Sequence, residues 1–296
     1  MQETMGRWDI AFPHLGLYFK DVPKSFSVFG FEIAYYGVFI AIGMLSGIFL
    51  AQRRAKKSGQ DPEMYGDFAI YAIIASVLGA RIFYVIFAWE SYRNNFWSVF
   101  NIREGGLAIY GGVIMAFVSA YVYCKIKKKS ALLLLDTAVP GLILGQIIGR
   151  LGNFMNREVF GEYTNSFLAM RLPTAAVRAS DVSAAHLSHM VDGTNYIQVH
   201  PTFLYEMLWN GLILTIMLLY TKHKKFTGEI SLIYLGGYGL GRGILEGIRT
   251  DRLTIPGTEL YINQILAFSL FAFSLITWIV IRVKLYQKTK KQTPTP

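Results

Sequence analysis

The sequence is poor in cysteine and in charge. Cys124 is its only cysteine, which excludes an internal disulfide framework and a metal site built from several cysteines. Only 16% of the 296 residues are charged, whereas 53% are apolar and 15% are aromatic. A soluble domain is usually less apolar than this, so we expect an integral membrane protein.

Acidic residues are scarcer than basic ones, 19 against 29, and the net charge is +10. In a soluble protein such a surplus would suggest a nucleic-acid partner. Here most of the basic residues lie in short segments between apolar stretches, where membrane proteins carry them. We therefore expect no nucleic-acid partner.

Seven apolar stretches are long enough to cross a bilayer core of about 30 Å, which takes about 20 helical residues. They are residues 27–51, 66–87, 106–124, 131–152, 202–220, 229–248 and 260–281. The predicted fold class is an all-α integral membrane protein with seven transmembrane helices.

The basic residues predict the orientation of these spans. Sixteen lysines and arginines lie in short segments after the first, third, fifth and seventh spans, whereas the longer segments on the other side hold ten. The positive-inside rule then places the N-terminus outside and the C-terminus in the cytoplasm. The expected parts are an extracytoplasmic N-terminal segment (1–26), four spans (27–152), an extracytoplasmic subdomain or arm (153–201), three spans (202–281) and a basic cytoplasmic tail (282–296).

Three arginines, Arg81, Arg150 and Arg242, lie within the predicted spans. An arginine at depth in a bilayer is costly and normally faces a bundle interior or a cavity. A lone arginine at a helix end more often reaches to the headgroups. Arg150 is not alone, because Asn153, Asn156, Arg157 and Glu158 follow it. This density of charge and amide groups favours a polar pocket.

The sixth span carries a second polar row, formed by Tyr238, Arg242, Glu246 and Arg249, whose spacing places them on one side of a helix. The simplest interpretation is a chain of Arg–Glu pairs without a ligand. Glu246 cannot neutralise two arginines, however, and the remaining guanidinium would suit an anionic headgroup, because its planar fork binds phosphate oxygens bidentately. We expect this row and Arg150 to form opposite walls of one site.

Other polar residues near the predicted span ends have two possible roles. Tyr36 and Tyr110 fit an interfacial aromatic belt better than catalysis. His200 precedes Pro201 at the start of the fifth span, which suggests a structural role. Glu206 lies within that span and is a possible partner for one of the intramembrane arginines.

The segment from Gly149 to Gly161, GRLGNFMNREVFG, resembles the signature of bacterial prolipoprotein diacylglyceryl transferases: Gly-Arg, then Asn-Phe-x-Asn-x-Glu, then a glycine three residues on. The resemblance continues in order over most of the chain. It includes Tyr36-Gly37, Arg81 with Tyr84-Val85, Gly105-Gly106 to Gly111-Gly112, His200-Pro201 with Leu204-Tyr205-Glu206, and Gly237-Tyr238-Gly239 with Arg242, Glu246 and Arg249.

Members of this family transfer the diacylglyceryl group of phosphatidylglycerol to the lipobox cysteine thiol of a prolipoprotein signal peptide and release glycerol phosphate. The resemblance implies a multi-pass enzyme of the bacterial cytoplasmic membrane that needs no cofactor or metal. It implies that Arg150 and Arg242 hold the phosphate and stabilise the leaving group. The other implied lipid-site residues are Tyr36, Arg81, Asn153, Glu158, Gly161, Tyr238, Glu246 and Arg249, with His200 and Glu206 as further candidates.

Tyr110 departs from the family pattern, because many members carry at this position a histidine that is proposed as the general base. A phenol with a pKa of about 10 is a poor base at neutral pH unless nearby arginines lower that pKa. Either Tyr110 acts as a tyrosinate, or it orients the substrate while the departing phosphate or Glu158 accepts the proton. The general base stays unassigned at this point.

Two other classes of protein could also place arginines in a helical bundle. A transporter or channel for an anionic metabolite or lipid would need polar residues along a path to the cytoplasmic face. The third, fifth and seventh predicted spans are instead apolar over their inner halves. A scaffold without enzymatic activity would have no obvious use for intramembrane arginines.

Overall fold

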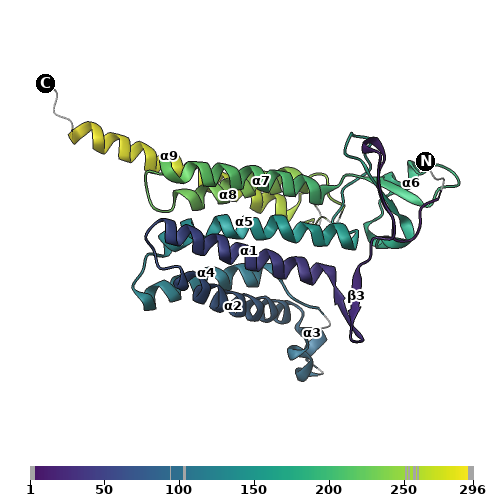
Figure 1. The fold of residues 1–296 in the computed structure, drawn as a ribbon, viewed down its shortest axis with the longest axis horizontal. Coiled ribbons are helices and arrows are strands. Elements are labelled where there is room, and N and C mark those ends of the chain that lie inside the picture. Colours follow the sequence, from purple (N-terminus) through teal and green to yellow (C-terminus); the bar gives the residue numbers. More distant parts are fainter. Residues whose placement is uncertain are drawn as a thin grey trace. The chain divides into compact units, whose positions relative to one another are not determined.

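The computed structural model describes residues 4–93, 95–102, 105–250, 252, 254–255, 258 and 260–292. The chain forms two compact units (Figure 1). The first contains Met1–Gly47 and Leu142–Pro296, and the second contains Ile48–Gly141. Helices α1 (Tyr35–Lys57) and α5 (Ala131–Asn156) contribute residues to both units.

Close contacts between glycines and neighbouring helices organise the helical part of the first unit. Helix α8 (Glu229–Glu246) packs against α7 (Thr202–Tyr220) and α9 (Ile262–Gln292). A Cβ atom on Gly239 would lie 2.6 Å from the backbone oxygen of Ala267 in α9, so only glycine fits there. A Cβ atom on Gly145 of α5 would lie 3.2 Å from the backbone oxygen of Gly43 in α1. Small residues thus let these helix backbones approach each other closely.

The second unit is built on α2 (Glu63–Phe87) and α4 (Ile109–Lys127), which pack along each other. Two short helices, α3 (Trp89–Tyr92) and η2 (Phe96–Phe100), lie in the connection between them. Tyr65, Tyr123 and Leu134 belong to its buried core, and Cys124 is buried with them. Cys124 therefore packs as a small apolar residue.

A small folded head in the first unit contains a four-stranded antiparallel sheet in the order β2-β1-β5-β6. Its strands are β1 (Ile10–Phe12), β2 (Leu17–Phe19), β5 (Met170–Pro173) and β6 (Tyr196–Val199). The registers include Ile10 opposite Phe19, and Met170 opposite Val199. Ile197 and Val199 alternate with more exposed neighbours and are fully buried in its core. The sequence predicts a subdomain or arm in 153–201 but not these strands.

Short helices complete the head and the loops of the first unit. They are η1 (Pro13–Leu15), η4 (Thr174–Ala176), η5 (Ala179–Asp181), α6 (Ala184–Ser188) and η6 (Thr221–His223). Figure 1 shows α6 among the strands of the head.

The predicted start of the first span, at residue 27, is wrong. β3 (Ser25–Val28) and β4 (Phe31–Ala34) form a hairpin, and the helix begins at Tyr35. Phe29 and Gly30 make the two-residue turn with φ of 50° and 82°, as a hairpin turn of this length requires. Ser25, Phe26, Ser27 and Val28 alternate polar and apolar side chains, which is the strand period.

Among the described residues, six helices are long and apolar enough to cross a membrane: α1, α2, α4, α5, α7 and α9. Helix α8 occupies most of the sixth predicted span, 229–248, but carries Glu229, Arg242 and Glu246, so its composition alone does not define a span. Helix α9 continues to Gln292, beyond the predicted end at residue 281, and residues 293–296 of the predicted tail lie outside the described residues. The chain is a mostly helical, multi-pass membrane protein, whereas the seventh span and the orientation of the termini stay predictions.

Candidate functional site

Three helices bring charged side chains together inside the first unit. Arg150 lies near the end of α5, Glu206 near the start of α7 and Arg242 near the end of α8. The guanidinium of Arg150 forms an ion pair with Oε2 of Glu206, and Nη1 of Arg242 lies 3.2 Å from Oε1 of the same carboxylate. Nη1 of Arg249 lies 3.6 Å from that Oε1 atom. One carboxylate is therefore shared by three arginines.

A second carboxylate, that of Glu246, completes this cluster. Nη2 of Arg242 lies 2.6 Å from its Oε2 atom, and the side-chain amide of Asn263 donates to its Oε1 atom at 2.9 Å. The side chains of Glu206 and Glu246 are only 5% and 1% exposed, so water contributes little to balancing their charges. The arginine cluster, defined as Arg150, Arg242, Arg249, Glu206 and Glu246, holds one more positive than negative charge.

The end of α5 extends the arginine cluster through a chain of side-chain hydrogen bonds. Nη1 of Arg150 donates to Oδ1 of Asn153 at 3.1 Å, and Nδ2 of Asn153 donates to Oε1 of Glu158 at 3.0 Å. Nδ2 of Asn156 also donates to Glu158, at 3.4 Å. These bonds fix the amide orientation of Asn153, which presents its oxygen to Arg150 and its nitrogen to Glu158.

Glu158 reaches Asn153 because the chain reverses directly after α5. Arg157 and Val159 both have left-handed backbone conformations, with φ of 56° and 57°. A β-branched residue such as Val159 rarely adopts this conformation. The hydroxyl of Thr202 donates to the carbonyl of Val159 and holds the turn. Strained backbone of this kind is concentrated at functional sites.

Tyr238 lies beside the arginine cluster on α8. It lines a cavity of about 10 Å³ together with Glu206, Trp209, Asn210 and Arg242, among others. A cavity of this volume is close to the minimum that holds one water molecule. The indole of Trp209 donates to the carbonyl of Gly237 at 2.8 Å, which fixes one wall of the cavity.

Gly161 contacts the arginine cluster through its backbone, and Tyr36 packs against the end of α5. Gly161 pairs with Arg249 through an isolated β-bridge, and its N–H donates to the carbonyl of His200 at 3.0 Å. A Cβ atom on Gly152 would lie 2.5 Å from the ring of Tyr36, so the end of α5 packs directly on that ring.

His200 lies two residues before the start of α7 and contacts that helix. Its Nδ1 atom lies 3.1 Å from the hydroxyl of Tyr205. Burial lowers the pKa of His200 below its ordinary value of 6.5, so the imidazole is neutral at neutral pH.

Two candidate residues, Arg81 and Tyr110, belong to the second unit. All five N–H donors of Arg81 are used on backbone carbonyls, at distances from 2.7 to 3.0 Å. The acceptors are Val99, Gly105, Gly106, Ser98 and Asn101. Arg81 thus orders the loop before α4. Tyr110, in the first turn of α4, is 39% exposed.

Two amides that take part in the site are not among the residues predicted from the sequence. Asn263 binds Glu246, and Asn210 is 3% exposed in the wall of the small cavity. A signal for Asn210 was present, because it lies four residues after Glu206 and therefore on the same face of α7. Asn263 is a polar residue near the start of a predicted span.

Helices of membrane-spanning length with a buried cluster of guanidinium and carboxylate groups at one end define a multi-pass membrane protein with a polar internal site. The prolipoprotein diacylglyceryl transferase family matches residues 23–280. The chain belongs to this family, and the resemblance in the sequence is confirmed.

Three relatives illustrate the similarity, and each bears the name phosphatidylglycerol–prolipoprotein diacylglyceryl transferase. The protein of Finegoldia magna is 37% identical over 89% of this chain and 95% of its own length. The protein of Clostridioides difficile is 38% identical over 90% of this chain and 96% of its own length. The protein of Shouchella clausii is 40% identical over 85% of this chain and 87% of its own length.

Proposed function

We propose that this protein transfers the diacylglyceryl group of phosphatidylglycerol to the cysteine thiol of a prolipoprotein signal peptide. The family assignment supports the reaction. The single structural observation that carries the proposal is the convergence of Arg150, Arg242 and Arg249 on Glu206. Three guanidinium groups around one buried carboxylate leave positive charge inside the bundle, where an anionic headgroup can use it.

The proposed reaction forms a C–S bond and breaks a C–O bond at the terminal glycerol carbon of the diacylglyceryl group. The thiol loses its proton, and glycerol phosphate departs with the electron pair of the broken bond. The phosphate changes from a diester with one negative charge to a monoester with nearly two. Guanidinium groups placed at that phosphate therefore stabilise the transition state more than the bound lipid.

Arg150 and Arg242 are proposed to hold this phosphate. Both are paired with Glu206, and the cavity beside Arg242 is only about 10 Å³. The phosphate must therefore share or replace the carboxylate contacts of Glu206. The pairing with Glu206 already orients the guanidinium groups of Arg150 and Arg242. Glu206 therefore acts as an internal counterion whose place the lipid phosphate takes.

The remaining candidates are proposed to shape the lipid site. They are Tyr36, Asn153, Glu158, Gly161, Tyr238, Glu246 and Arg249, with His200 at the start of α7. For Arg81 we propose a positioning role, since its donors are occupied by carbonyls of the loop before α4. The proton acceptor is proposed to be Tyr110, Glu158 or the departing phosphate.

The proposed topology has seven spans, with α8 as the sixth, in a bacterial cytoplasmic membrane. The N-terminus and the head would then face outward, and the basic C-terminal segment would face the cytoplasm, as the positive-inside rule predicts. A translocated precursor would meet Arg150 and Arg242 from the outer side. The alternative of an anion transporter is not favoured, because the relatives are named as transferases.

The test is a transfer assay with purified protein, phosphatidylglycerol vesicles and a lipobox peptide. We expect the peptide to gain the mass of one diacylglyceryl group, and a peptide with serine in place of the cysteine to gain none. The exposed Arg93→Lys variant serves as the matched control for arginine substitutions. Absence of the mass gain with folded protein, or an equal gain on the serine peptide, would contradict the proposed function.

A further inference from the structure

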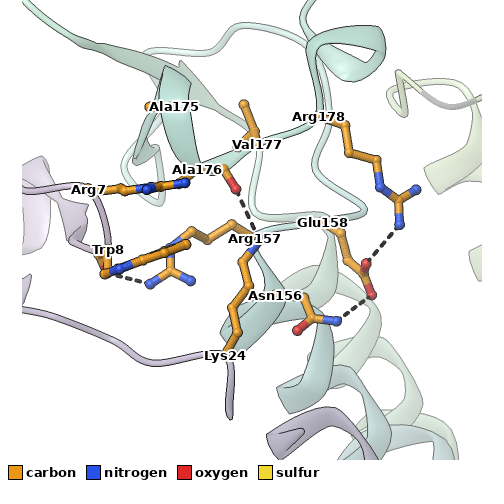
Figure 2. A pocket seen from close by; sticks show the side chains of 10 residues that line it. All are labelled: Arg7, Trp8, Lys24, Asn156, Arg157, Glu158, Ala175, Ala176, Val177 and Arg178. Carbon is orange, nitrogen blue, oxygen red and sulfur yellow. Dashed lines mark hydrogen bonds and ion pairs between the residues drawn. The ribbon is translucent and has the colours of Figure 1, made fainter.

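The head contains a cavity of about 330 Å³ that shares no lining residue with the small cavity beside Tyr238. Figure 2 shows the side chains that line this larger cavity. We call it the head pocket. Its charged and aromatic lining consists of Arg7, Trp8, Lys24, Arg157, Glu158 and Arg178. These residues come from the N-terminal segment, the turn after α5 and the loop after η4, and all of them belong to the first unit.

The head pocket is strongly basic. Four cationic side chains and one carboxylate line it, which leaves three surplus positive charges. Burial, and after it the charge of Arg157, lowers the pKa of Lys24 below its ordinary value. Such a lowering means that the ammonium of Lys24 is short of water and close to other cations. An anion bound here would offset the repulsion between these cations.

The floor of the head pocket is held in place by Arg157. Its guanidinium donates to the carbonyl of Met155 at 2.7 Å and also to the carbonyls of Trp8 and Val22. It lies 5.3 Å from the ring centre of Trp8, and Arg7 lies 4.8 Å from the same centre. Arg157 is therefore fixed as a structural cation. The other cations have weaker partners in the free protein: Lys24 donates to the carbonyl of Ala176 at 3.3 Å, and the 72% exposed side chain of Arg178 lies 3.4 Å from Glu158. A bound anion can compete with these contacts.

Glu158 connects the head pocket with the arginine cluster. Its Oε1 atom accepts from Asn153, which binds Arg150, and its Oε2 atom lies 3.4 Å from Nη2 of Arg178 (Figure 2). Polar groups thus run without a break from Arg150 to the mouth of the head pocket, where Arg178 is 72% exposed. This route has a guanidinium group at each end, Arg150 and Arg178, with the amide of Asn153 and the carboxylate of Glu158 between them.

We infer that the head pocket binds a small phosphate monoester and that its ligand is the glycerol phosphate released by the transfer reaction. This inference rests on the proposed function. A monoester carries nearly two negative charges, which the three surplus positive charges of the head pocket match better than the single charge of a phosphodiester. The glycerol hydroxyls can donate to Glu158. The head pocket then serves as a holding site that draws the product away from the arginine cluster.

The test measures equilibrium binding of radiolabelled glycerol phosphate to the detergent-solubilised full chain. Lys24→Gln and Arg178→Gln should each weaken binding about tenfold, since one charge-assisted hydrogen bond contributes about that factor. Lys24→Arg should retain binding, which separates loss of charge from misfolding. Lys20→Gln removes the same charge from an exposed position in the same segment and should bind as the wild type does.

Competition identifies the source of the phosphate. Unlabelled glycerol phosphate should displace the label, inorganic phosphate should do so more weakly, and phosphatidylglycerol vesicles should not. Equal binding by Lys24→Gln and wild type would overturn the inference. Displacement by phosphatidylglycerol that depends on Lys24 would also overturn it and would indicate a lipid-headgroup site. Binding requires no turnover, so the two proposals fail in different ways. Transfer without glycerol phosphate binding would refute the head pocket alone. Binding without transfer would refute the proposed function, and with it the origin of the ligand, while leaving a phosphate-monoester site in the head pocket.

Discussion

Replacing Glu206 by glutamine is the sharpest test of the arginine cluster. The substitution keeps the size of the side chain but removes the negative charge that Arg150, Arg242 and Arg249 share. The net charge of the cluster then rises from one to two. Glu246 cannot replace Glu206 as the shared partner of these arginines, because it already contacts Arg242 and Asn263.

The contact distances set the size of the effect. At 3.2 and 3.6 Å, and with an effective dielectric constant of about 20, the contacts of Arg242 and Arg249 with Glu206 each amount to about 5 kcal/mol before desolvation is subtracted. Desolvation cancels much of this gain, and removing one partner of a buried ion pair typically costs about 3–5 kcal/mol. We expect Glu206→Gln to unfold about 6–20 °C below the wild type.

The assay is thermal unfolding in detergent, with and without phosphatidylglycerol. The lipid should raise the Tm of Glu206→Gln more than that of the wild type, because its phosphate no longer competes with the carboxylate. Phosphatidylcholine serves as the lipid control, and Glu90→Gln, at a 78% exposed ion pair, serves as the protein control with a nearly unchanged Tm. A Tm of Glu206→Gln within about 2 °C of the wild type would refute the shared counterion, and equal lipid-induced shifts would refute the competition.

Three further predictions concern single side chains. Arg150→Lys should remain in the membrane but lose at least about 90% of its transfer activity, because an ammonium cannot reproduce the two-pronged contact with phosphate; near-normal activity would remove Arg150 from the site. Tyr110→Phe should be inactive over a pH series if the phenol is the base, and Tyr110→His should then regain activity at a lower pH; an active Phe variant would exclude the phenol. His186 is a buried, neutral imidazole. Its Nδ1 atom accepts from the N–H of Ser183, and its Nε2 atom lies 3.1 Å from the carbonyl oxygen of Gly161. Burial lowers the pKa of His186 below 6.5. The unfolded chain therefore binds more protons below about pH 6.5, so stability should fall as the pH drops below that value. His186→Gln should flatten this dependence in Tm measured between pH 5 and 8; an unchanged slope in His186→Gln would contradict the assignment.

The helices could be read from the sequence because their apolar runs are long and the membrane leaves few alternatives. The polar row on α8 was predictable for a similar reason, since helical spacing alone aligns Arg242 with Glu246. The hairpin before α1 was not predicted, because Phe26, Val28, Phe31 and Ile33 also read as the start of an apolar span. Only their alternation with polar neighbours distinguishes the two structures.

The partner of each arginine could not be read from local sequence. Glu206 was a candidate for one arginine, but its contacts with three depend on how α5, α7 and α8 pack. Arg81 was grouped with Arg150 because both lie in apolar helices, whereas its five bonds to carbonyls depend on the path of the loop before α4. Burial of an arginine thus indicates that it has partners but not which ones they are.

The turn after α5 connects the head with the arginine cluster. Two residues other than glycine, Arg157 and Val159, adopt left-handed conformations there, and such strain costs about 1–3 kcal/mol per residue. The turn persists because the guanidinium of Arg157 binds the carbonyls of Trp8 and Val22 and the hydroxyl of Thr202 binds Val159. The N-terminal segment therefore stabilises the one backbone conformation that places Glu158 against Asn153 on one side and Arg178 on the other. The head thereby fixes the geometry of the helix end that carries Arg150.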